Sequence, residues 1–192
     1  DLALAQTDLA TAGLRKHFPD LIVGREIIRT TGDMRLDVSL REAGKLAKGL
    51  FTKELDVALA EGKTQASVHS LKDLPTERPV GFHLTAILPR EDWRDVLISR
   101  HVDGVEGLPW GARVGTGSPR RVMQLMALRP DAVFLPVRGN VPTRVSKVRE
   151  GAEGLDAIVL AAAGLKRLGL WPGGNREQEL AGLQLLPLSD FL

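Results

Sequence analysis

The chain has 192 residues, of which 43% are hydrophobic and 26% charged, and its formal net charge is +2. This composition is typical of a soluble protein with a buried core, arranged as one large or two small domains. The small net charge argues against a bulk nucleic-acid binder, which usually carries a strong basic stripe. Without any cysteine, these residues form no disulfide, zinc–cysteine site or cysteine nucleophile.

Two kinds of targeting signal are missing from the sequence. No apolar run reaches the roughly 18 residues of a membrane span, and the first residues show no signal-peptide pattern. We therefore expect a cytoplasmic protein that binds neither membranes nor nucleic acids, and we predict no metal site.

Helical and strand-like patterns alternate through the first half of the chain. Leu2 to Phe18 has apolar residues at helical spacing and is followed by Pro19, which predicts a helix that ends there. A second helix is predicted over 50–61. Strands are predicted over 21–29, 66–68 and 82–88.

The alternation resumes after a charged break at 89–95, P-R-E-D-W-R-D. Strands are predicted over 96–99, up to Val114, and over 133–137 and 157–160, with helices over 120–128, over 141–150 and from 164. This order predicts an α/β fold with mainly parallel sheets covered on both faces. We predict two doubly wound domains with a cleft between them, the first over 1–89 with 180–192 returning to it, the second over 90–179.

The segment V-H-S-L-K-D-L-P-T, Val68 to Thr76, places polar groups directly after a predicted strand. Open α/β sheets bind ligands at the carboxyl ends of their strands, which makes Ser70, Lys72 and Asp73 candidate site residues. Lys72 and Asp73 are equally consistent with a surface ion pair, which contributes little to stability. This segment by itself leaves both interpretations open.

A second signal lies in V-G-T-G-S-P-R-R, Val114 to Arg121. Ser118 is a good helix N-cap and Pro119 suits the first helical position. Arg120 and Arg121 then fall in the first turn, where cations oppose the helix dipole by about 0.3–1 kcal/mol each. Since helix starts bind anions, this placement predicts a negatively charged ligand.

Three further arginines follow predicted strands: Arg138, Arg144 and Arg167. Such positions converge on one edge of a parallel sheet, and the planar arginine fork suits carboxylates. The glycine-containing turn matches neither the P-loop nor G-x-G-x-x-G, so a nucleotide is not the expected ligand. The pattern predicts a site for a carboxylated small molecule.

These motifs, in this order and spacing, resemble the porphobilinogen deaminase (hydroxymethylbilane synthase) family. Besides the segments already quoted, the resemblance includes K-G-L-F-T-K-E-L, R-E-D-W-R-D, R-G-N-V-P-T-R and L-D-A-I-V-L-A-A-A-G-L-K-R-L-G-L. It implies a transferase that joins four porphobilinogen molecules head to tail, with loss of ammonia, into hydroxymethylbilane for haem and other tetrapyrroles. It also implies a monomer whose first two domains resemble type II periplasmic binding proteins. The product grows on a dipyrromethane cofactor attached to a cysteine of a third domain.

The resemblance also assigns roles to single residues. Asp73 matches the catalytic aspartate, whose carboxylate stabilises the cation left on the pyrrole after ammonia departs. Ser70 and Thr116 are expected to line the same cleft. The residues that match the binders of cofactor and substrate carboxylates are Lys48, Lys72, Ser118, Arg120, Arg121, Arg138, Arg144 and Arg167.

The chain departs from the family pattern in having no cysteine for the cofactor. We interpret it as a fragment without the third domain and expect no sustained turnover from it alone. The alternative function is a two-domain binding or sensing module for a carboxylated small molecule. Asp73 discriminates between the two, because an anion sensor has little reason to place a carboxylate in a cation-rich pocket.

Overall fold

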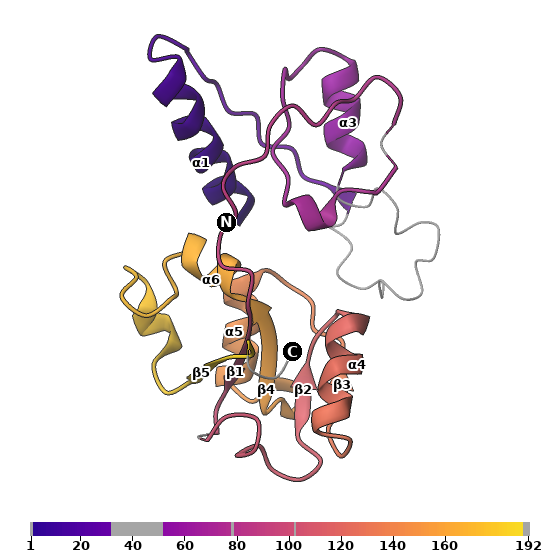
Figure 1. Ribbon diagram of the computed structural model, residues 1–192, viewed down its shortest axis with the longest axis vertical. Helices are drawn as coiled ribbons and strands as arrows, with labels where there is room; N and C mark the ends of the chain where they lie inside the picture. Colours follow the sequence, from indigo (N-terminus) through magenta and orange to yellow (C-terminus); the bar gives the residue numbers. More distant parts are fainter. Residues whose placement is uncertain (1, 32–51, 78, 102, 190–192) are drawn as a thin grey trace. The chain divides into compact units, whose positions relative to one another are not determined.

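The computed structural model describes residues 2–31, 52–77, 79–101 and 103–189. The chain divides into two compact units, one built from residues between 3 and 89 and the other from residues after Pro89 (Figure 1). Among the described helices, none combines the length and hydropathy that crossing a bilayer requires.

The first unit contains helices α1 (Leu2–His17) and α3 (Lys53–Ala60) and the 3-10 turn η2 (Leu71–Asp73). Helix α1 ends one residue before Phe18, as the following Pro19 predicts, and α3 lies within the predicted helix. The strands predicted over 21–29, 66–68 and 82–88 are wrong, because the described residues there join no ladder. Apolar and β-branched residues favour an extended backbone, but a strand also needs a paired neighbour.

The second unit contains one five-stranded sheet in the order β3-β2-β4-β1-β5. The strands are β1 (Asp95–Ser99), β2 (Arg113–Gly115), β3 (Val133–Leu135), β4 (Ala157–Ala161) and β5 (Gln184–Pro187). The helices are α4 (Pro119–Leu128), α5 (Val141–Arg149) and α6 (Ala162–Arg167), with 3-10 turns η3 (Ala152–Gly154) and η4 (Glu177–Leu180). Every strand and helix predicted after residue 95 is therefore present, within a few residues of its expected bounds.

Both faces of this sheet are covered, as predicted. Val96 and Ile98 of β1 pack into one hydrophobic cluster with residues of α5 and α6, whereas Leu97 packs into the other with Leu125 of α4. Alternate side chains of a strand point to opposite faces, so strand β1 contributes to both clusters. Figure 1 shows the corresponding layers.

The direction of the strands corrects the prediction of a mainly parallel sheet. β2 is parallel to β3 and β4, but β1 is antiparallel to both of its neighbours, β4 and β5. Strand β5 also corrects the predicted return of 180–192 to the first domain, because it lies in the second unit. Its Leu185 packs against one hydrophobic cluster and Leu186 against the other, so pairing with β1 buries apolar surface on both faces.

The reversed direction of β1 has a consequence for the site. Asp95, the first residue of β1, pairs with Ala161 at the end of β4. The beginning of β1 therefore lies at the edge where β4 ends, beside the connection to α6. Gly115, the last residue of β2, is also packed tightly, since a Cβ there would lie 2.9 Å from Ile158 Cγ2.

Candidate functional site

The turn between β2 and α4 is built as the sequence predicts. The Ser118 hydroxyl oxygen accepts a hydrogen bond from the backbone N–H of Arg121 at 3.5 Å, and Pro119 is the first helical residue. Thr116 is buried, and its hydroxyl oxygen accepts from the N–H of Ser118 at 3.2 Å. Within the protein, the Thr116 side chain therefore shapes the turn that presents the start of α4.

Arg121 is held by groups from two neighbouring strands. Its Nε and Nη2 donate to the two carboxylate oxygens of Asp95 at 2.7 and 2.6 Å, and its Nη1 donates to the Val159 carbonyl at 3.1 Å. A bidentate pair of this kind fixes the plane of the guanidinium as well as its position. The helix start thus presents an oriented arginine side chain.

Arg138 lies in the connection between β3 and α5, and Arg144 lies in the first turn of α5. Asn140 caps α5 by accepting from the N–H of Thr143 at 2.9 Å, and Arg144 Nε donates to the Gly139 carbonyl at 2.7 Å. Burial, together with the positive charges of Arg121 and Arg138, lowers the pKa of the Arg144 guanidinium. The positive charges of Arg121 and Arg138 therefore both act on Arg144.

The other two predicted arginines are placed differently. Arg167 lies in α6, and its buried Nε has no hydrogen-bond partner within the described part of the chain. Arg120 is exposed on α4, beside Pro119, Met123 and Gln124. The first is a buried donor without an acceptor, and the second is available at the protein surface.

The predicted residues of the first unit lie around η2. Lys72 and Asp73 are exposed in this turn, and the Ser70 hydroxyl donates to Gln6 Oε1 of α1 at 2.8 Å. Burial lowers the pKa of His69, while the negative charges of Asp56 and Asp73 act in the opposite direction. Lys48, the remaining predicted binding residue, lies outside the described residues.

Sequence reasoning missed the acidic residues that hold this edge of the sheet, Asp95 and Asp92. Asp92 pairs with Arg94 at 2.6 Å and with Lys166 of α6 at 2.7 Å, and Lys166 lies 5.2 Å from the centre of the Trp171 ring. The hydrogen bonds from Arg94 and Lys166 keep the pKa of Asp92 well below its usual value. The motif R-E-D-W-R-D, interpreted above as a charged break, was the available signal.

A family model described as "Porphobilinogen deaminase, dipyromethane cofactor binding domain" matches residues 1–189. The chain belongs to the porphobilinogen deaminase family. It is 52% identical to a porphobilinogen deaminase of Desulforudis audaxviator, over 88% of this chain and 53% of that protein. It is 48% identical to a porphobilinogen deaminase of Syntrophomonas wolfei, over 88% of this chain and 54% of that protein. It is 51% identical to one of Ralstonia nicotianae, over 88% of this chain and 49% of that protein. The chain spans about half the length of these curated relatives.

The arginine cluster fits the cofactor named in the description of the porphobilinogen deaminase family. Dipyrromethane carries acetate and propionate groups, and carboxylates would offset the repulsion among Arg121, Arg138 and Arg144. They would also supply an acceptor for the buried Nε of Arg167. The residues present therefore suit a ligand with several carboxylates.

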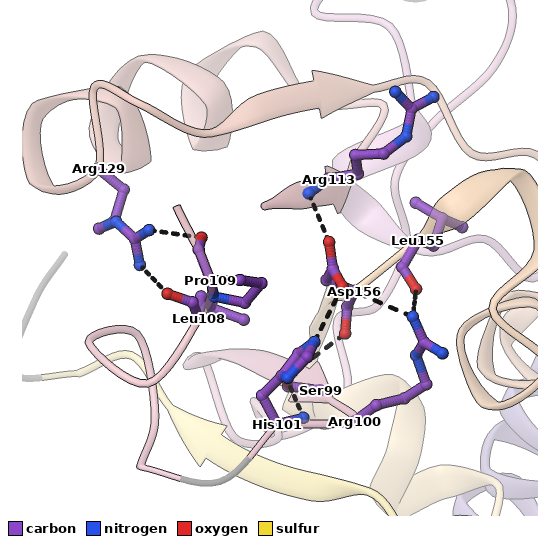
Figure 2. Close-up of polar contacts among 9 residues, drawn as sticks. All are labelled: Ser99, Arg100, His101, Leu108, Pro109, Arg113, Arg129, Leu155 and Asp156. Carbon is purple, nitrogen blue, oxygen red and sulfur yellow. Dashed lines mark hydrogen bonds and ion pairs between the residues drawn. The ribbon is translucent and has the colours of Figure 1, made fainter. Parts of the chain in front are cut away.

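A second polar cluster in this porphobilinogen deaminase family member, centred on Asp156, has a structural role. Its carboxylate accepts hydrogen bonds from His101 Nε2 and from the backbone N–H of Arg113, both at 2.9 Å (Figure 2). Arg100 Nη2 lies 3.5 Å from Asp156 Oδ1. Asp156 directly precedes β4, whereas Arg167 follows this strand. The cluster ties together the starts of β2 and β4 and the end of β1.

Asp156→Asn is expected to lower the free energy of unfolding and to make that free energy depend less on pH in the acidic range. Burial acts to raise the pKa of Asp156, but the bonds from Arg113 and His101 and the charges nearby give a net decrease. The carboxylate therefore stabilises the fold above the unfolded-state pKa of about 3.9, and this contribution is lost as the pH falls through the lower folded-state pKa. The measurement is the free energy of unfolding in urea between pH 7 and pH 3. At pH 7 we expect this free energy to be about 1–3 kcal/mol lower for Asp156→Asn than for the wild type. The exposed Glu106, changed to Gln, is the control; equal behaviour of both variants would contradict the assignment.

Proposed function

We propose that this chain is part of a transferase that joins four porphobilinogen molecules head to tail into hydroxymethylbilane, with loss of ammonia at each step. The observation that carries the proposal is the gathering of Arg121 and Arg138 around the partly buried Arg144. A fold that brings like charges together is expected to bind an anion there. Membership of the porphobilinogen deaminase family supports pyrrole carboxylates as that anion.

The second unit would bind these carboxylates at the edge formed by the ends of β2, β3 and β4. Each pyrrole ring brings an acetate and a propionate, so a growing chain needs several cationic partners. In this proposal, Arg138 and Arg144 act as bidentate donors, and Arg167 uses the buried Nε that has no partner in the described structure. The full set of proposed binding residues is Lys48, Ser70, Lys72, Thr116, Ser118, Arg120, Arg121, Arg138, Arg144 and Arg167.

Dipyrromethane, when bound, supplies the pyrrole on which the product grows. These 192 residues contain no cysteine, so they would hold it through its carboxylates and not through a thioether. At the start of α4, Pro119 has no backbone N–H, and the N–H groups of Ser118 and Arg121 already donate to Thr116 and Ser118, so the arginine side chains would supply the main donors. The chain's own contribution is thus to bind and orient the cofactor.

Asp73 would carry out the electrostatic part of the chemistry. It is exposed in η2, where its carboxylate can accept a hydrogen bond from a pyrrole N–H. Positive charge develops on the pyrrole as ammonia leaves, and a carboxylate beside the N–H stabilises that charge and can assist proton transfer. Lys72, its neighbour in the turn, would bind a ring carboxylate.

The test is an assay of the protein expressed from its complete gene. We expect one ammonia released for each porphobilinogen consumed, with uroporphyrin formed after oxidation of the product. Binding of porphobilinogen without ammonia release would instead support the sensing module, which family membership does not favour. The proposal includes a cytoplasmic monomer that needs neither nucleic acid nor a membrane, which sedimentation and cell fractionation would check.

A further inference from the structure

Asp95 and Arg121 form a pair that is mostly withdrawn from water. Their side chains are 27% and 16% exposed, and the two hydrogen bonds between them are 2.7 and 2.6 Å long. Asp95 starts β1, and Arg121 lies in the first turn of α4, which follows β2. The pair therefore joins the start of the reversed strand to the helix that begins the arginine cluster.

The pairing leaves part of the Arg121 guanidinium available. Arginine has five N–H donors; Asp95 accepts from Nε and Nη2, and the Val159 carbonyl accepts from Nη1, so two of the five remain. One remains on each terminal nitrogen. These two terminal nitrogens can together bind one carboxylate in the bidentate way.

Asp95 also changes the electrostatics of the cluster. Arg121 is one of the two charges that lower the pKa of Arg144. A carboxylate bonded to Arg121 offsets its charge, which reduces the repulsion that acts on Arg144 before any ligand binds. Unlike a ligand, this carboxylate belongs to the protein and is present in every state of the site.

We propose that Asp95 is a positioning residue, which holds Arg121 side-on so that its two terminal nitrogens face an acetate or propionate of the ligand. This inference rests on the proposed function and deepens it. Pre-orientation of this kind raises affinity because the side chain loses little freedom when the ligand binds. A purely structural ion pair would contribute to stability alone.

The same helix offers a matched control. At the other end of α4, Arg129 donates from Nε and Nη2 to Asp131 at 2.8 and 2.7 Å, and its other bonds go to backbone carbonyls such as those of Leu108 and Pro109 (Figure 2). The donor atoms are the same as in the Asp95–Arg121 pair, and Asp131 also accepts from the Gly111 N–H at 2.9 Å. Arg129 is not among the charges that act on Arg144. Asp131→Asn therefore measures the cost of breaking such a pair without touching the proposed site.

The experiment compares Asp95→Asn with Asp131→Asn in the protein expressed from its complete gene. For Asp95→Asn we expect the KM for porphobilinogen to rise about tenfold or more, the size of a lost charge-assisted hydrogen bond. The inhibition constant of porphobilinogen dimethyl ester, which has no carboxylate, should not change. Asp131→Asn should lower the melting temperature and leave both constants unchanged. An equal change in KM for the two variants would overturn the proposal. So would an equal change, in Asp95→Asn, of the KM for porphobilinogen and of the inhibition constant of its dimethyl ester.

Three further variants extend the test, of which Asp95→Glu and Arg121→Gln remain usable if Asp95→Asn does not fold; the third is Asp95→Asn combined with Arg121→Gln. Asp95→Glu keeps the charge, and the KM should lie between those of the wild type and Arg121→Gln. In the Arg121→Gln background, Asp95→Asn should not raise KM further, because the arginine that Asp95 positions is already absent. If Arg121→Gln raises KM but Asp95→Asn or Asp95→Glu does not, the inference fails and the proposed function stands. If the wild-type protein neither binds nor consumes porphobilinogen, both fail.

Discussion

Asp73→Asn is expected to lower kcat by about 10²–10⁴-fold, the range of a lost general acid–base group. The asparagine keeps the size of the side chain but removes the negative charge that would stabilise a cationic pyrrole. Asp73 is exposed in η2, so the fold should survive the change. The measurement is kcat for porphobilinogen, together with the melting temperature of the same sample.

Glu77→Gln supplies the control for this substitution. Glu77 is an exposed carboxylate in the same segment, only four positions further along the chain. Its removal changes the net charge in the same way, so kcat should stay at the wild-type value. Full activity of Asp73→Asn or Asp73→Ala would show that the mechanism proposed for this carboxylate is wrong.

Arg144→Gln should weaken ligand binding without a matching loss of stability. Loss of a charged hydrogen-bond donor to a ligand carboxylate predicts a KM for porphobilinogen that rises about 10–100-fold. The fold loses the bond from Nε to the Gly139 carbonyl, but it also loses a partly buried charge that repels Arg121 and Arg138. These two effects oppose each other, so the free energy of unfolding should change by less than about 1 kcal/mol.

The matched control is Arg149→Gln, on the same helix α5. Arg149 is exposed in the last turn, whereas Arg144 is partly buried near the start. Its replacement removes one positive charge and should leave KM unchanged. If Arg144→Gln unfolded the protein and kept its affinity, Arg144 would be a structural residue and not a ligand-binding one.

Local sequence signals predicted the helix ends that build the site. Pro19 marks the end of α1, and Ser118 and Pro119 mark the start of α4. Each of these features depends on hydrogen bonds and backbone angles within one turn of the chain. For that reason they can be read from neighbouring residues without knowledge of the fold.

The strands were predicted with unequal success. In the second unit, runs such as Val96 to Ser99 are buried on both faces and are found where the sequence places them. In the first unit, the segments 21–29 and 82–88 have similar composition but form no strand among the described residues, and Ile22 is 95% exposed. Composition indicates which segments can be extended, whereas pairing depends on partners that lie far away in the chain.

The sequence by itself determined the family and the arginines that follow β2, β3 and β4, since both depend on motifs and on residues close to strand ends. Only the tertiary structure decided that β1 runs antiparallel, that β5 pairs with it, and that Asp95 meets Arg121 across 26 positions of the chain. A carboxylate at the start of a parallel strand would lie at the opposite edge of the sheet from these arginines. The direction of β1 follows from its pairing with β4 and β5, which lie far away in the chain and leave no local pattern, and it is this direction that places Asp95 beside the proposed site.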